Sequence, residues 1–246
     1  MDLSSPQFWM AVLQIVAIDV VLGGDNAVVI GLACRKLPPR ERRLGIIWGM
    51  AGAIGLRVVL IFFAVSLLAV PYLKIVGAFL LLWIGIKLLQ PEPDEGGHNI
   101  EAGVTLLSAI KTIIVADAVM SLDNVIAIAG AAGESKGLVI FGLLLSVPII
   151  VLGSQLVIKL MDRFPIVVTG GGALLGWIAG GMIVTDVALK AMIAQSVPYA
   201  EWIGPVSGAL LVIVVGKWLA ARTEARRAGA LVDLAARQPG DGPDSH

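Results

Sequence analysis

Seven long apolar runs follow one another along the chain, and most of its charged residues lie outside these runs. A membrane-spanning α-helix needs about 20 consecutive apolar residues, and most of the runs meet this length. The pattern predicts an all-α polytopic membrane protein with seven transmembrane helices. The third is short, and the first and fourth have room for a break. The predicted spans are residues 8–33, 44–70, 73–89, 103–132, 137–160, 166–192 and 202–221.

The first three predicted spans resemble the next three. The sequence DVVLGGDNAV at residues 19–28 returns as DAVMSLDNVI at 117–126, and GAFLLLWI at 77–84 returns as GGALLGWI at 171–178. Because each unit has an odd number of spans, its copy must enter the membrane from the opposite face, around a pseudo-twofold axis in the membrane plane. The predicted architecture is two inverted three-helix repeats plus one extra helix.

This organisation divides the chain into five parts. The connection between the halves is acidic and rich in Pro and Gly, which is typical of a solvated linker. The tail is expected to continue as a basic helix to about Arg237 before its apolar residues run out. The parts are a first three-helix repeat (1–90), a cytoplasmic acidic linker (91–102), a second inverted three-helix repeat (103–192), a seventh transmembrane helix (193–221) and a cytoplasmic tail, basic and then disordered (222–246).

Composition supports this class, because 58% of the residues are apolar and only 15% are charged. The 18 Lys and Arg residues balance the 18 Asp and Glu residues, but most basic residues fall on one side of a seven-span topology. The positive-inside rule then predicts an external N-terminus and a cytoplasmic C-terminus, in a multi-pass protein of the plasma (inner) membrane. The lipid bilayer is an expected partner and nucleic acid is not.

Each copy of the repeat carries two aspartates inside an apolar run: Asp19 and Asp25 in the first, Asp117 and Asp123 in the second. A carboxylate at the centre of a spanning helix costs about 2.5–3.5 kcal/mol, so four cost on the order of 10 kcal/mol unless something offsets them. Inverted repeats bring equivalent residues together near the midplane, so the four carboxylates are expected to meet there. A bound cation would offset their charge.

The two aspartates of one copy need a break in the helix to face the same site. Six residues of unbroken helix turn through about 600°, which leaves Asp19 and Asp25 about 120° apart. Glycine weakens a helix, so Gly23 and Gly24 predict a break in the first copy, and Ser121 predicts a milder one in the second. Unwinding would expose backbone carbonyls beside the carboxylates.

Carboxylate, amide and carbonyl oxygens are the ligands that hard divalent cations prefer. The predicted metal ligands are Asp19, Asp25, Asn26, Asp117, Asp123 and Asn124. Met120 is a further candidate for a softer ion, against the more frequent use of Met as a flexible core side chain.

Each candidate also has a structural alternative. Asp25 and Asp123 are residue types that cap a helix, and the two asparagines are suited to hydrogen bonds between helices. Arg57, in the second span, is expected to pair with one aspartate as a structural ion pair. Asp186, near the outer end of the sixth span, is interpreted chiefly as an interfacial residue within reach of water.

The sequence offers little for an enzyme. It has no His-Glu-x-x-His pattern and no Gly-rich phosphate loop, and its two histidines lie in the linker and the tail. Cys34 is the single cysteine, which excludes an intramolecular disulfide. An intramembrane aspartyl protease needs one carboxylate pair, whereas this chain duplicates two pairs together with Asn. We therefore expect no catalytic residues and no permanent cofactor.

The motifs GGDNAVVI at residues 23–30 and SLDNVIAI at 121–128 resemble those of the TerC family of integral membrane proteins, more narrowly its YjbE-like branch. The resemblance runs from residue 8 to about residue 221. It implies membership of a lysine-exporter-like superfamily of small transporters, an association with manganese efflux and the tellurium resistance that names the family. It also implies that the six oxygen-bearing residues above form the ion site.

The expected function is a secondary transporter that exports a divalent cation, with Mn²⁺ ahead of Ca²⁺. Carboxylates must lose protons to bind metal, so protons are the expected counter-ion. The alternative is a membrane scaffold or stress-resistance protein in which the aspartate cluster only holds helices together. The sequence leaves open the physiological ion, its direction, the stoichiometry with protons and whether the chain forms a homodimer.

Overall fold

The structure is a computed structural model that describes residues 6–68, 70–91, 105–132 and 136–237. These ranges are all-helical and contain no strand. Their helices are α1 (Pro6–Leu22), α2 (Gly24–Cys34), α3 (Pro39–Leu68), α4 (Leu73–Leu89), α5 (Leu106–Ala132), α6 (Lys136–Arg163), α7 (Pro165–Thr185), α8 (Lys190–Ser196) and α9 (Ala200–Arg237). Apart from Pro91, the predicted linker lies outside the described residues, as does the end of the tail.

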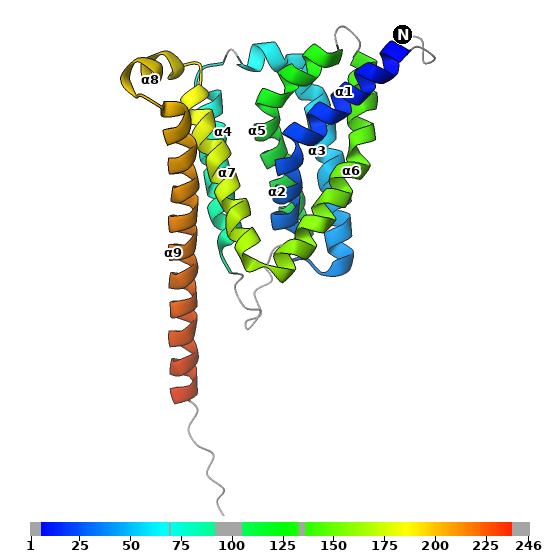
Figure 1. The fold of residues 1–246 in the computed structure, drawn as a ribbon. Helices are drawn as coiled ribbons and strands as arrows, with labels where there is room; N and C mark the ends of the chain where they lie inside the picture. Colours follow the sequence, from blue (N-terminus) through cyan, green and yellow to red (C-terminus); the bar gives the residue numbers. More distant parts are fainter. Residues whose placement is uncertain (1–5, 69, 92–104, 133–135, 238–246) are drawn as a thin grey trace, which may run out of the picture.

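The long helices form two groups, which Figure 1 shows side by side. In one group α7 packs between α4 and α9. In the other, α3 packs along α5, and α1 and α2 pack along α6. The contacts between the groups are sparser and run mainly from α4 to α5 and from α2 and α6 to α7.

Glycines allow α7 and α9 to approach closely. A Cβ atom added at Gly176 would lie 2.3 Å from the carbonyl oxygen of Gly208, and one added at Gly180 would lie 2.0 Å from that of Gly204. Only glycine fits such backbone contacts, as in other small-residue interfaces between membrane helices. The small-residue pattern of α7 therefore serves packing within the chain.

Four helices of the described residues are long and apolar enough to cross a membrane: α3, α6, α7 and the first part of α9. The pair α1 and α2, bent by 47°, counts as a fifth if it forms one span. The seven spans predicted from the sequence also include α4 and α5, which are not among these candidates. Helix α4 has only 17 residues, and the 27 residues of α5 include the charged side chains Lys111, Asp117 and Asp123. The chain is a multi-pass membrane protein, and its described residues contain four to five candidate spans by length and composition.

The predicted sixth span is too long. It was expected to reach residue 192, but α7 ends at Thr185 and a separate short helix, α8, begins at Lys190. Asp186 ends α7 because its backbone is extended and its side chain accepts hydrogen bonds from the N–H groups of Tyr72, Lys74 and Ala188. The Asp186 side chain, which was expected within reach of water, is fully buried.

Candidate functional site

The helix break predicted in the first copy is present. Helix α1 ends at Leu22 and α2 begins at Gly24, with Gly23 between them. The Gly23 N–H donates to the Asp19 carbonyl oxygen over 2.7 Å, and a Cβ atom at Gly23 would lie 2.4 Å from that oxygen. Gly24 has open space around it. Gly23 is therefore the residue that requires the absence of a side chain.

The break predicted at Ser121 is wrong, because α5 continues without interruption from Leu106 to Ala132. The second copy has no glycine in this position. The Ser121 hydroxyl donates to Oδ2 of Asp117, one turn earlier, over 3.2 Å. It therefore satisfies a carboxylate instead of competing for the backbone hydrogen bonds of the helix.

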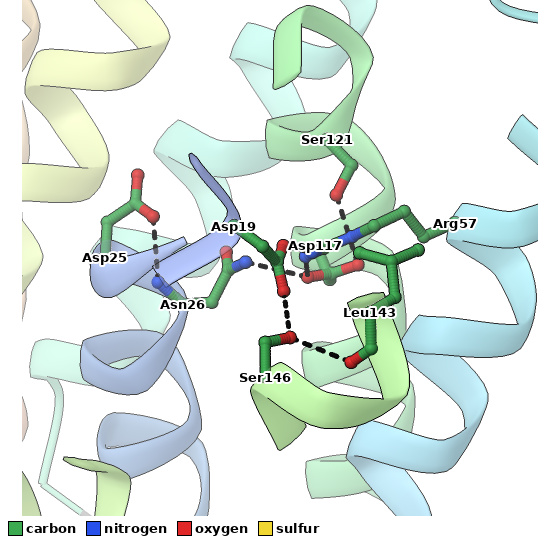
Figure 2. A network of polar contacts seen from close by, with 8 residues as sticks. All are labelled: Asp19, Asp25, Asn26, Arg57, Asp117, Ser121, Leu143 and Ser146. Carbon is green, nitrogen blue, oxygen red and sulfur yellow. Dashed lines mark hydrogen bonds and ion pairs between the residues drawn. The ribbon is translucent and has the colours of Figure 1, made fainter. Parts of the chain in front are cut away.

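Asp19 and Asp117 meet at a single guanidinium group. Arg57 from α3 donates through Nη1 to Oδ1 of Asp19 and through Nη2 to Oδ1 of Asp117, the latter over 2.5 Å (Figure 2). All three side chains are buried. Sequence reasoning assigned Arg57 one carboxylate partner, and the structure gives it two, one from each copy of the repeat.

Ser146 of α6 completes the coordination of Asp19 and was missed in the sequence. Its hydroxyl contacts Oδ2 of Asp19 and lies 2.8 Å from the Leu143 carbonyl oxygen. The only signal was a hydroxyl group in the middle of an apolar span. Ser154, in the same helix, gives the same signal, but its hydroxyl donates to the Val151 carbonyl oxygen.

Asn26 links the start of α2 to the second copy. Its Nδ2 donates to Oδ1 of Asp117 over 2.9 Å, which is the interhelical hydrogen bond proposed as the alternative to metal binding. Its Oδ1 is buried and has no hydrogen-bond partner among the described residues. An unsatisfied buried acceptor costs about 1–3 kcal/mol, so this oxygen is suited to receive a water molecule or a cation.

A small cavity adjoins these side chains. It is lined by Asp19, Asn26, Arg57, Asp117 and Ser146 together with apolar residues of α2, α3, α5 and α6, and its volume is about 20 Å³. That volume holds roughly one water molecule or one bare ion. The chain thus brings two carboxylates, an amide oxygen and a hydroxyl to a space of ionic size, with Arg57 as the cation present.

Of the other predicted ligands, Asp25, Asn124 and Met120 do not line this cavity. Asp25 is half-buried and lies on the far side of Asn26 from Arg57 in Figure 2, and its Oδ1 accepts a hydrogen bond from the Asn26 N–H over 2.9 Å. Asp25 lies inside the first turn of α2, whose N-cap is Gly23 without a side-chain cap hydrogen bond, so it does not cap the helix in the way that the alternative predicts. Asn124 is half-buried on α5, and Met120 belongs to a buried apolar cluster. The Asp123 side chain lies outside the described residues.

The described part of the chain contains no group of three or more His, Cys, Asp or Glu side chains arranged to hold a metal ion. Asp19 and Asp117 supply two carboxylates, and any further ligands would be the neutral oxygens of Asn26 and Ser146. With one guanidinium against two ionised carboxylates, the cluster carries one excess negative charge.

Comparison with known proteins identifies the family. The family model of the integral membrane protein TerC family matches residues 4–224. The chain is 43% identical over 188 residues to the uncharacterized membrane protein YjbE of Bacillus subtilis (strain 168), covering 76% of this chain and 85% of that one.

More distant relatives cover similar shares of the chain. The uncharacterized membrane protein YceF of Bacillus subtilis (strain 168) is 23% identical over 185 residues, covering 72% of each chain. The UPF0053 inner membrane protein YgdQ of Escherichia coli (strain K12) is 23% identical over 179 residues, covering 66% of this chain and 75% of that one. No solved structure matches the chain. The chain therefore belongs to the TerC family of integral membrane proteins.

Proposed function

We propose that this protein is a secondary transporter that exports a divalent cation, with Mn²⁺ as the first candidate and Ca²⁺ as the second. The observation that carries the proposal is the convergence of Asp19 and Asp117 on one guanidinium beside a cavity of about 20 Å³. Carboxylate and amide oxygens suit Mn²⁺ and Ca²⁺. The outward direction and the preference for Mn²⁺ rest on the resemblance to the TerC family.

Pairs of equivalent contacts support the inverted repeat on which this mechanism depends. Gly49 of α3 packs on Ile113 of α5, and Gly142 of α6 packs on Ile15 of α1. Ile15 and Ile113 are 98 positions apart, the same spacing as Asp19 and Asp117. If α1 and α2 correspond to α5, and α3 corresponds to α6, then the contact between α3 and α5 corresponds to the contact of α6 with α1 and α2. Such an axis would pass close to the carboxylate pair, where secondary transporters keep their ion sites.

In the proposed cycle, Arg57 and the transported cation exchange at the carboxylates. With Arg57 bound, two ionised carboxylates and one guanidinium leave one negative charge. A divalent cation in its place neutralises both carboxylates, and Oδ1 of Asn26 becomes a further ligand. Arg57 must then turn to another partner, and Asp25, which already interacts with it electrostatically, is the candidate among the described residues.

Protons are the proposed counter-ion. A buried carboxylate without a cation is stabilised by protonation, because an uncompensated charge in a low-dielectric site is costly. After the metal has left, a carboxylate that Arg57 does not contact again can therefore take up a proton. Metal and protons would then move in opposite directions through the same two side chains.

The proposed topology has seven spans with α4 and α5 included, an external N-terminus and a cytoplasmic C-terminus in the plasma membrane. The relative YgdQ is named as an inner membrane protein. Lys and Arg residues gather at the ends of α2, α4, α6 and α9 and at the start of α3, which supports the same orientation.

A flux assay tests the proposal. The purified protein in liposomes that contain a Mn²⁺-sensitive dye should carry Mn²⁺ and move protons in the opposite direction. Asp117→Asn should lower Mn²⁺ flux at least tenfold, whereas Asp162→Asn, an exposed carboxylate at the end of α6, should leave it unchanged. Flux that is equal in both variants would reject the site, and flux that ignores the pH gradient would reject proton coupling.

One observation favours the scaffold alternative. Arg57 satisfies both carboxylates and joins α1, α3 and α5, as a purely structural ion-pair network would. If cells that lack the protein keep unchanged intracellular manganese after a metal challenge, and the liposomes show no flux, the aspartate cluster is structural.

A further inference from the structure

The carboxylate site is closed off from water. Its polar residues, Asp19, Asn26, Arg57, Asp117 and Ser146, are between 1% and 6% exposed. An ion that enters or leaves the site must therefore pass between packed side chains. The apolar residues on each side of the site indicate which side chains these are.

On one side, four helices contribute to a buried apolar layer. It contains Ile30 of α2, Met50 of α3, Ile113 of α5 and Ile150 of α6, which belong to one buried cluster and line the cavity beside the carboxylates. Each of them lies one or two turns from a polar residue of the site, toward the end of the bundle where α3 and α5 begin and α2 and α6 end. We refer to these four residues as the Ile113 layer.

A second apolar layer covers the opposite side of the site. It contains Phe8, Val12 and Ile15 of α1 with Leu138 and Leu143 of α6, and we refer to it as the Ile15 layer. It lies toward the end of the bundle where α1 begins in Figure 1 and where α6 begins as well. None of its residues lines the cavity. The site is thus enclosed between two apolar layers, and its cavity extends toward the Ile113 layer alone.

Ile113 and Ile15 occupy equivalent positions in these layers. Each precedes the paired aspartate of its own copy by one helical turn, and each packs on a glycine of a neighbouring helix. A Cβ atom added at Gly49 would lie 2.6 Å from Cδ1 of Ile113, and one added at Gly142 would lie 2.5 Å from Cγ2 of Ile15. Both isoleucines are at most 2% exposed. Each therefore fills the space directly beside its carboxylate, on opposite sides of the site.

We propose that Ile113 and Ile15 are the gate residues of the carboxylate site, each closing it toward one side of the membrane. The inference rests on the proposed transport function, because a transporter must open one central site to the two sides in turn. A charge is costly to bury without polar partners, so an ion does not cross either layer while it is packed. The cavity leaves the Ile113 layer with fewer contacts on the side of the site, so this gate is the one that opens more easily.

Thiol labelling from each side of the membrane tests the two gates. The reporter is Ser146→Cys, whose side chain lies beside Asp19 between the layers, in a chain whose single cysteine is removed by Cys34→Ala. Right-side-out and inverted membrane vesicles are treated with a permanently charged, membrane-impermeant methanethiosulfonate. Ile113→Ala should raise the labelling rate about tenfold from one side only, and Ile15→Ala should do so only from the opposite side.

Matched variants separate a gate from loosened packing in general. Leu175 of α7 is as deeply buried but belongs to neither layer, so Leu175→Ala should leave labelling slow from both sides. Ile113→Val and Ile15→Val remove one methyl group each. They should show the same sidedness with a smaller increase, which keeps the test decisive if an alanine variant fails to fold.

Four outcomes would overturn the proposal: fast labelling of the reporter without a further change, no increase in the isoleucine variants, an increase from the same side in both, or an equal increase in Leu175→Ala. The first would mean that the site is reached by another route. The labelling needs no metal. Absence of Mn²⁺ flux in liposomes would therefore reject the transport function, whereas loss of the sidedness alone would reject the gates.

Discussion

Asp19 and Asp117, which occupy equivalent positions in two copies of one sequence motif, bind the same guanidinium group from two different helices. Their charges are thereby brought together and partly neutralised at once. The pair depends on Arg57 in the structure, and on a cation in its place if the protein transports metal.

Replacement of Arg57 should strongly destabilise the fold. Arg57→Gln leaves two buried carboxylates without a counter-charge, and breaking a buried ion pair by removing one partner costs about 3–5 kcal/mol. Arg40→Gln, at an exposed position near the start of the same helix, should change the stability by less than about 0.5 kcal/mol. Thermal or chemical unfolding in detergent measures both, and equal effects would contradict a central role of the ion pair.

Mn²⁺ should restore much of the stability of Arg57→Gln. If the metal and the guanidinium use the same oxygens, removing Arg57 removes the competitor, so the variant should bind Mn²⁺ more tightly than the wild type. The expected result is a larger Mn²⁺-dependent rise of the unfolding midpoint in the variant, which the additional change Asp117→Asn abolishes. A smaller rise in Arg57→Gln than in the wild type would refute the exchange.

Gly23 and Gly24 should respond in opposite ways to alanine. A Cβ atom at Gly23 would lie 2.4 Å from the Asp19 carbonyl oxygen, so Gly23→Ala must displace the end of α1 and with it Asp19. Gly24 has open space, and alanine in the first turn of α2 should stabilise the helix by up to about 1 kcal/mol. Unfolding and Mn²⁺ flux of the two variants check this, and a tolerated Gly23→Ala would mean that the break is not required.

Asp186 should stabilise the protein in a pH-dependent way. Burial by itself raises the pKa of Asp186, but the N–H groups of Ala188, Tyr72, Ile75 and Lys74 outweigh it and hold the pKa below its usual value. These bonds also fix Tyr72, whose φ of 67° lies in the left-handed region. Asp186→Asn should therefore cost about 1–3 kcal/mol near neutral pH.

The sign of the pH effect follows from the lowered pKa. The stabilisation is fully present above the ordinary Asp pKa of about 3.9 and is lost as the pH falls through the folded-state pKa, because the unfolded chain takes up the proton first. Unfolding curves of the wild type and Asp186→Asn should converge at low pH, with Asp162→Asn as the exposed control. A difference that grows on acidification would contradict the role of Asp186.

The repeated sequence motif led us to expect that Asp19 and Asp117 approach each other, and both carboxylates do bind one guanidinium. It did not predict that both bind Arg57. If Gly49 of the first copy corresponds to Gly142 of the second, then Arg57 corresponds to Ile150. The second copy therefore has no charged residue at the position of Arg57, and comparing the copies gave no sign that Arg57 serves both aspartates. Ser146 was missed for a similar reason, since a single hydroxyl in an apolar helix carries no sign of its partner.

Local backbone behaviour was harder to predict. Two adjacent glycines gave the break in the first copy, whereas Ser121 alone does not interrupt α5, because its hydroxyl bonds the Asp117 carboxylate. The sequence argument expected that a break between Asp19 and Asp25 would let both face one site. The break is present, but Asp25 does not line the cavity. The end of α7 depends on N–H groups of the α3–α4 turn, more than 100 positions away in the chain, which no local pattern reveals.

An anomalous-scattering map at the manganese edge, from crystals of the protein grown with Mn²⁺, tests the central claim most directly. The account predicts one strong peak bonded to carboxylate oxygens of Asp19 and Asp117, with the guanidinium of Arg57 moved away from them and no such peak in Asp117→Asn. A map without a peak at these two side chains, with Arg57 still bound to both, would contradict it.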